Sequence, residues 1–154
     1  MPLSQFPRLL RSLAPSETLN MEAYLFTYGT LMQGFENSFA QKLRHNAAFR
    51  STGYFYGKLY DLGHYPAAIF DPNTERKVYG EIWQLPHFEP IIADLDYYEG
   101  IDEANPEYVR ELVPVADANH QIWHCWTYLS CQLPQNLRLI PHGDYRKWLT
   151  DPSN

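Results

Sequence analysis

Short runs of apolar residues, often alternating with polar ones and punctuated by glycine and proline, dominate the chain. A period of two is typical of strands that present one face to a core, and Gly and Pro mark the turns between them. Strands are predicted over residues 22–28, 77–85, 107–117 and 120–130, with two or three shorter ones between residues 51 and 70. The sequence therefore predicts a protein in which strands outnumber helices.

Apolar residues recur at helical spacing in three further segments. The first covers residues 35–43, the second residues 88–99, and a short third one residues 142–149. Helices mixed among strands in this order predict an α+β fold: a small, curved, mixed but mostly antiparallel sheet or barrel with a few helices.

The length of 154 residues suits one domain, which we assign to residues 22–154. Residues 1–21 form a predicted N-terminal extension with no acidic residue before Glu17 and a rough apolar stripe. A transit peptide has this character, but a surface extension or a start codon assigned upstream of Met21 explains it equally well. The extension is therefore left out of the fold prediction.

The predicted helix over residues 88–99 carries an acid on its apolar face. At about 100° per residue, Phe88, Ile92 and Leu95 fall on one stripe, and Glu99 falls on it too. Gly100 follows as an expected helix stop. A carboxylate facing a core costs free energy unless it is paired or protonated, so the presence of Glu99 requires an explanation.

Three interpretations of Glu99 remain open from the residues alone. It is a catalytic acid/base, a partly exposed acid at a helix end, or a buried acid paired with Arg or Lys. Asp94 and Asp96 project from opposite flanks of the same helix, where no special role is expected. Glu81 lies inside an apolar strand and is expected to face solvent or to hold a salt bridge.

The turn between the first strand and the first helix, "YGTLMQG" at residues 28–34, is a second candidate site. Gly29 permits a sharp bend, and consecutive backbone N–H groups after it can converge on an anion. A helix N-terminus nearby would add to the positive potential. An ordinary strand-to-helix turn is the competing interpretation.

Metal and thiol chemistry lack support in the sequence. His120 and His124 share a face of a predicted strand, but no third ligand accompanies them. Cys131 has no nearby histidine to activate it. We therefore expect no metal site and no organic cofactor.

The charge and composition limit the partners. The net charge of −6 and the lack of basic clusters argue against nucleic acid and anionic membranes. No apolar run reaches the roughly 18 residues of a transmembrane helix. Two cysteines are too few for a disulfide framework, which favours a reducing, cytoplasmic location. The oligomeric state is left open.

Several short motifs come in an order that resembles one known family. They are "TYGTLM", "GKLYDLGHYPAAI", "VYGEIW", "LDYYEG" followed by "YVRELVPV", "WTYL" and "PHGDY". This order is similar to that of the gamma-glutamylcyclotransferase superfamily, and most similar to its AIG2-like branch, which includes gamma-glutamylamine cyclotransferase. The resemblance covers Tyr24 to Tyr145, nearly all of the predicted domain.

The resemblance implies a function and a set of site residues. Glu99 aligns with the family's acid/base glutamate, and the helical wheel selects the same residue independently. The residues implied in substrate binding are Tyr28, Gly29, Thr30 and Leu31 of the turn, together with Tyr108 and Tyr128.

The implied reaction cyclises a gamma-glutamyl amine or amide to 5-oxoproline and releases the amine. Its partner is thus a small gamma-glutamyl substrate. The main alternative is a non-catalytic protein that binds a gamma-glutamyl compound or another carboxylated metabolite. A further alternative is a structural domain that binds a partner protein through tyrosines on its surface. The sequence leaves the identity of the released amine open.

Overall fold

Strands outnumber helices in the computed structural model, which describes residues 23–86, 88–101, 103–104, 106–131 and 137–151. The predicted extension over residues 1–21 lies outside these ranges, and so does the side chain of Phe88. The strands are β1 (Ala23–Thr27), β2 (Ala48–Asp61), β3 (Pro66–Phe70), β4 (Lys77–Leu85), β5 (Tyr108–Asp117), β6 (Ile122–Ser130) and β7 (Arg138–Leu139). The helices are α3 (Ser38–Asn46), α4 (Phe88–Glu99) and α5 (Tyr145–Thr150).

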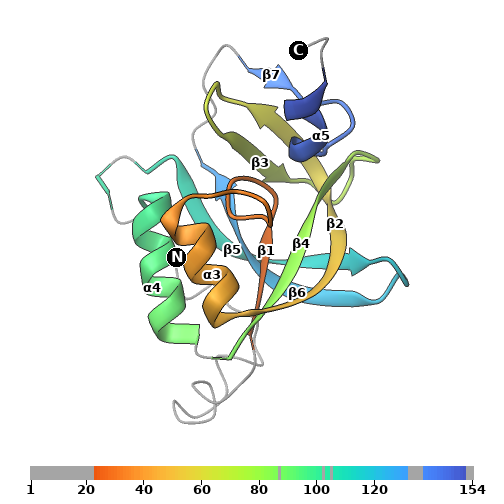
Figure 1. Cartoon of the computed structure of the whole chain (residues 1–154). Helices are drawn as coiled ribbons and strands as arrows, with labels where there is room; N and C mark the ends of the chain where they lie inside the picture. The colour runs from red at the N-terminus through yellow and green to blue at the C-terminus, as the bar shows by residue number, and fades with distance from the viewer. Residues whose placement is uncertain (1–22, 87, 102, 105, 132–136, 152–154) are drawn as a thin grey trace.

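Five of the strands close into a barrel. Strand β2 pairs with β4, β4 with β1, β1 with β6 and β6 with β5, and β5 returns to pair with β2. All of these pairs are antiparallel except β1 with β6. The short strands β3 and β7 extend the far end of β2 (Figure 1). The prediction of an α+β fold with a curved, mostly antiparallel sheet or barrel is confirmed.

Two apolar clusters stabilise this arrangement. One fills the barrel and includes Phe26, Phe55, Ile82 and Val115. The other packs the helices against the outside of the barrel, where α3 and α4 lie next to each other (Figure 1). It includes Leu43 of α3, Ile92 and Leu95 of α4, and Trp83 and Trp126 of the strands. Burial on this scale is the dominant favourable contribution to folding.

Several predicted boundaries were wrong, and local structure explains two of them. Helix α3 begins at Ser38 rather than at residue 35 because Asn37 caps it, its Oδ1 accepting a hydrogen bond of 2.8 Å from the Ala40 amide. Strand β6 begins at Ile122, so His120 lies in the preceding turn with a φ of 62°. His120 therefore does not share a strand face with His124.

Glu81 departs from its predicted exposure. Its side chain is only 4% exposed, so the expectation that it faces solvent was wrong. The alternative, a salt bridge, is confirmed, with Arg146 Nη2 3.5 Å from Glu81 Oε2. The other oxygen, Oε1, accepts a hydrogen bond of 2.8 Å from the Gln33 amide. Glu81 thus anchors the segment after β1 to strand β4.

Candidate active site

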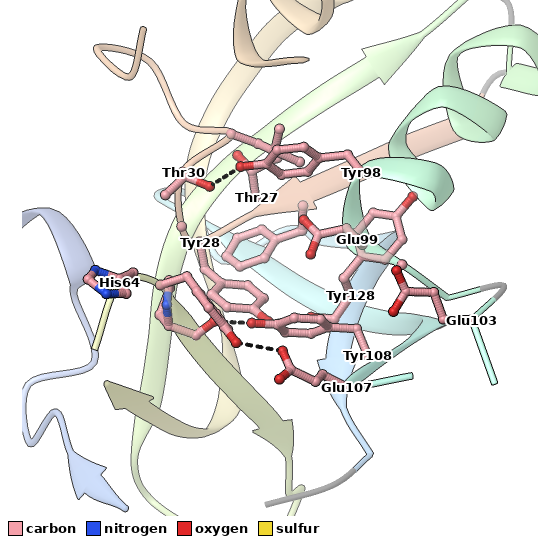
Figure 2. A pocket seen from close by; sticks show the side chains of 16 residues that line it. Thr27, Tyr28, Thr30, His64, Tyr98, Glu99, Glu103, Glu107, Tyr108 and Tyr128 are labelled. Carbon is pink, nitrogen blue, oxygen red and sulfur yellow. Dashed lines mark hydrogen bonds between the residues drawn. The ribbon is translucent and has the colours of Figure 1, made fainter. Parts of the chain in front are cut away.

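A cavity of about 500 Å³ opens between the end of β1, the start of β3 and the end of α4. All seven site residues implied by the sequence resemblance line it, and Figure 2 shows most of their side chains. They are Tyr28, Gly29, Thr30, Leu31, Glu99, Tyr108 and Tyr128. Residues as far as 100 positions apart in the chain therefore meet in one pocket.

Glu99 is the last residue of α4, and its carboxylate points into the cavity (Figure 2). The helix ends there because Gly100 adopts a φ of 70°, which a glycine accepts without strain. Ile92 and Leu95, on the same stripe of the helix, are buried as predicted. Within the described part of the chain, no hydrogen bond or ion pair engages the Glu99 carboxylate. None of the described Arg and Lys residues therefore pairs with Glu99.

The surroundings of Glu99 favour its neutral form. Burial raises the pKa of this carboxyl group from an ordinary 4.5 to about 8, and the negative charge of Asp96 adds to the shift. The Glu99 charge in turn raises the pKa of Tyr28, Tyr108 and Tyr128, although burial is the larger cause for each phenol. The carboxyl group is thus poised to change its protonation state near neutral pH.

Hydrogen bonds fix the conformation of the turn after β1. The Thr30 hydroxyl lies 2.8 Å from the Tyr98 hydroxyl, and Asn37 Nδ2 donates a hydrogen bond of 2.7 Å to the Thr30 carbonyl. Met32 closes the turn by donating to the Gly29 carbonyl at 3.1 Å. Among the described residues, no acceptor pairs with the amides of Thr30 and Leu31. Thr30 and Leu31 both line the pocket, so their backbone amides are its candidate anion-binding groups.

Position 29 requires a glycine because Pro66 packs close to its backbone. A Cβ atom at this position would lie 2.9 Å from Pro66 Cγ, closer than carbon atoms normally pack. Pro66 is itself held by Tyr108, whose hydroxyl donates a hydrogen bond of 2.7 Å to the Pro66 carbonyl. The start of β3 and the turn after β1 thus form one side of the pocket together.

The tyrosine hydroxyls of the pocket are already engaged with protein groups. The Tyr28 hydroxyl donates to the Tyr128 carbonyl, and the Tyr108 hydroxyl to that of Pro66. The Tyr128 hydroxyl donates to Asp96 Oδ1 at 2.7 Å. These three side chains therefore offer their rings, rather than free hydroxyls, to a bound molecule.

Sequence reasoning missed two contributors behind and beside the pocket. Asp96, expected to be an unremarkable flank residue, forms a two-bond ion pair with Arg110 at 2.9 and 3.1 Å. Its partner lies on β5, and only the three-dimensional fold brings the two together. Thr27 lines the pocket with a hydroxyl that is buried, and no described residue pairs with it. A threonine ending a strand gives no such signal in the sequence.

The described residues show no group of three or more His, Cys, Asp or Glu side chains that could hold a metal ion. Cys125 is buried and Cys131 is exposed, and both are free thiols. None of the helices over the described ranges is long and apolar enough to cross a membrane.

Comparison with known proteins identifies the family. Residues 25–147 match the family model described as gamma-glutamyl cyclotransferase, AIG2-like. The gamma-glutamylcyclotransferase family protein YtfP of Escherichia coli K12 is 30% identical over 125 residues, which cover 79% of this chain and 94% of that protein. The chain belongs to the AIG2-like gamma-glutamyl cyclotransferase family.

Solved structures share the fold. YkqA from Bacillus subtilis superposes with a TM-score of 0.62 and 25% identity over 82% of this chain, which spans only 40% of the YkqA chain. An AIG2-like protein from Mus musculus superposes with a TM-score of 0.59 and 22% identity, covering 85% of this chain and 84% of the mouse protein. At that identity the mouse structure supports the fold alone.

Proposed function

We propose that this protein is a gamma-glutamyl cyclotransferase-type enzyme, which cyclises a gamma-glutamyl amine or amide to 5-oxoproline and releases the amine. The family membership supports this class of activity. The observation that carries the proposal is Glu99, a partly buried carboxyl group that lines the same pocket as the turn after β1. A protein that only bound a carboxylated ligand would not need this acid, because burying it costs free energy.

The substrate brings its own nucleophile, the α-amine, within reach of its γ-carbonyl carbon. The Glu99 carboxylate takes a proton from the α-ammonium, and the amine nitrogen then bonds to the γ-carbonyl carbon and closes a five-membered ring. The bond from that carbon to the leaving nitrogen breaks as the Glu99 carboxyl group returns its proton to that nitrogen. The ring nitrogen still carries a second proton from the α-ammonium, and the Glu99 carboxylate passes this proton to the released amine. The products are the neutral lactam of 5-oxoproline and an ammonium ion. Atoms and charge balance without a metal or an organic cofactor.

The raised pKa of Glu99 suits both proton transfers. General acid–base catalysis is most efficient when the pKa of the group lies near the working pH. A carboxyl group with a pKa of about 8 is a stronger base than an ordinary glutamate when ionised, and it still holds its proton near neutrality for the leaving nitrogen. One side chain thereby serves as base and then as acid.

The turn and the rings bind the substrate in this proposal. The amides of Thr30 and Leu31 receive the α-carboxylate, and Gly29 keeps the approach to them open. The rings of Tyr28, Tyr108 and Tyr128 enclose the carbon chain of the substrate and hold it in the folded conformer that cyclises. We assign residues 22–154 to the catalytic domain. The two free thiols accord with a cytoplasmic location.

The test is to incubate the protein with a panel of gamma-glutamyl compounds and to quantify 5-oxoproline and the released amine. Equal amounts of both, unaffected by a metal chelator, would support the mechanism. The Glu99→Gln variant serves as the matched inactive control. Binding of these compounds without any turnover would overturn the enzyme assignment and make the protein a binding module.

A further inference from the structure

The Tyr98 side chain connects the turn after β1 to the last turn of helix α4. Its hydroxyl lies 2.8 Å from the Thr30 hydroxyl, and both residues line the pocket. In Figure 2 the phenol extends from the helix that ends at Glu99 to the turn, where a dashed line marks this contact. Tyr98 therefore joins the candidate carboxylate-binding turn to the residue next to the candidate acid/base.

Helix α3 holds both partners of this contact. The Phe39 ring packs against the Tyr98 ring, with the ring centres 4.6 Å apart. Asn37, which caps the same helix, donates a hydrogen bond of 2.7 Å from its side-chain amide to the Thr30 carbonyl. The Tyr98 hydroxyl thus meets a turn whose conformation is already fixed, so the contact has one defined geometry.

The placement of Glu99 depends on its neighbours. Among the described residues, no hydrogen bond or ion pair anchors its carboxyl group, and it is the last residue of α4, where helices fray. Its position is therefore set by the side chains that hold the last turn of the helix. Asp96 ties that turn to strands β5 and β6 through its bonds to Arg110 and Tyr128. Tyr98 ties it to the turn after β1.

We propose that Tyr98 is a positioning residue of the active site, whose hydroxyl sets the separation between Glu99 and the backbone amides that receive the α-carboxylate. This inference rests on the proposed function and adds a residue to it. Ring closure and the proton transfers require the substrate and the carboxyl group in one defined geometry, and a displacement of about 1 Å costs up to about a hundredfold in rate. Tyr98 acts through Glu99 and the turn, and takes no part in the proton transfers.

Tyr98→Phe tests this role, because it removes the hydroxyl and keeps the ring that packs on Phe39. Since the amides of the turn remain, KM for a gamma-glutamyl amide should change by less than about twofold, while kcat falls by roughly three- to tenfold, the worth of one such hydrogen bond. The pH at which kcat/KM rises should stay that of the parent, because Asp96 and the burial of Glu99 are unchanged. Tyr97→Phe is the matched control, since this neighbouring side chain is 80% exposed, and it should keep the parental kcat.

A double-mutant cycle tests whether the two hydroxyls act as a pair. Thr30→Val and Tyr98→Phe each remove one partner, so the double variant should lose no more kcat than the larger of the two single losses. Thr30→Ser keeps a hydroxyl and should retain more of kcat than Thr30→Val. Thermal unfolding of every variant shows whether a loss of kcat is separate from a loss of stability.

Three outcomes would overturn the positioning role and leave the cyclotransferase proposal standing. They are parental kcat in Tyr98→Phe, with or without a lower melting temperature, an equal loss of kcat in Tyr97→Phe, and single losses that multiply in the double variant. Absence of 5-oxoproline when the parent protein is given every gamma-glutamyl compound of the panel would overturn both proposals.

Discussion

The hydroxyl of Tyr128 donates a hydrogen bond of 2.7 Å to Asp96, three residues before Glu99 on the same helix. Arg110 donates to the same Asp96 oxygen at 2.9 Å. A pocket-lining ring is thereby fixed to the acid whose charge contributes to the raised pKa of Glu99. Helix α4 thus supplies both the proposed catalytic carboxyl group, on Glu99, and a second one, on Asp96, that raises its pKa.

This relationship predicts the effect of Asp96→Asn. Removing the negative charge lowers the pKa of Glu99, so the ionised form exists at lower pH and the acidic limb of kcat/KM should move toward lower pH. The sequence alone gave no reason to expect an effect at this position. The measurement is a pH profile of kcat/KM for parent and variant. Asp94→Asn is the control, because Asp94 pairs with Lys42 on the surface, and an equal shift in both variants would contradict the prediction.

Activity should depend on the protonation of Glu99. Because the carboxylate form removes the first proton, kcat/KM of the parent should rise as the pH approaches about 8. Glu99→Gln keeps the shape of the side chain but cannot transfer a proton, so turnover should fall by at least roughly a hundredfold while ligand binding persists. Steady-state kinetics and calorimetric binding separate the two effects. Near-parental turnover in Glu99→Gln would exclude Glu99 as the acid/base.

The same variant should alter the pH dependence of stability. Between pH 4.5 and about 8 the folded protein keeps a proton on Glu99 that the unfolded chain releases, so the free energy of unfolding falls as the pH rises through this window. Across this pH range the free energy of unfolding falls by at most about 5 kcal/mol. Glu99→Gln should abolish this decline and be more stable than the parent above pH 8. Urea unfolding of both proteins at pH 5 and pH 8.5 provides the measurement.

The turn should tolerate changes to its hydroxyl better than changes to its backbone. Gly29→Val places side-chain atoms against Pro66 and should abolish substrate binding. Thr30→Ser retains a hydroxyl that reaches Tyr98, and it should change KM by only a few-fold. Calorimetric titration of both variants with a gamma-glutamyl ligand measures the two effects on binding. Equal damage from both substitutions would indicate recognition by the threonine side chain instead.

Thr27→Val tests whether the ligand satisfies the buried hydroxyl. The substitution keeps the shape of the side chain and removes a polar atom that has no partner among the described residues, so the free energy of unfolding should stay constant or rise. If the substrate bonds to this hydroxyl, KM should increase by roughly three- to thirtyfold, which corresponds to about 0.7–2 kcal/mol. An unchanged KM would assign the threonine to packing alone. Thermal unfolding and Michaelis kinetics together provide the two readouts.

The sequence predicts local features well because they depend on nearby residues. The stripe that holds Ile92, Leu95 and Glu99 follows from helical spacing, and both apolar members are buried as expected. The ion pair of Asp96 with Arg110 could not be predicted, since it depends on how α4 lies against β5. The salt bridge expected of Glu81 forms, but its burial could not be predicted for the same reason, because its contacts with Gln33 and Arg146 lie outside its own strand.

The parallel pairing of β1 with β6 has a consequence for when the pocket forms. Leu25 lies opposite Trp126 in this pair, and the Tyr28 hydroxyl reaches the Tyr128 carbonyl 100 residues further along the chain. Contacts so distant in sequence form slowly, because a long loop must close before they stabilise anything. The pocket is therefore completed only after most of the chain has been synthesised and β6 has joined the barrel. A nascent or truncated chain that lacks β6 has the turn and Glu99 but no enclosure to bring a substrate between them.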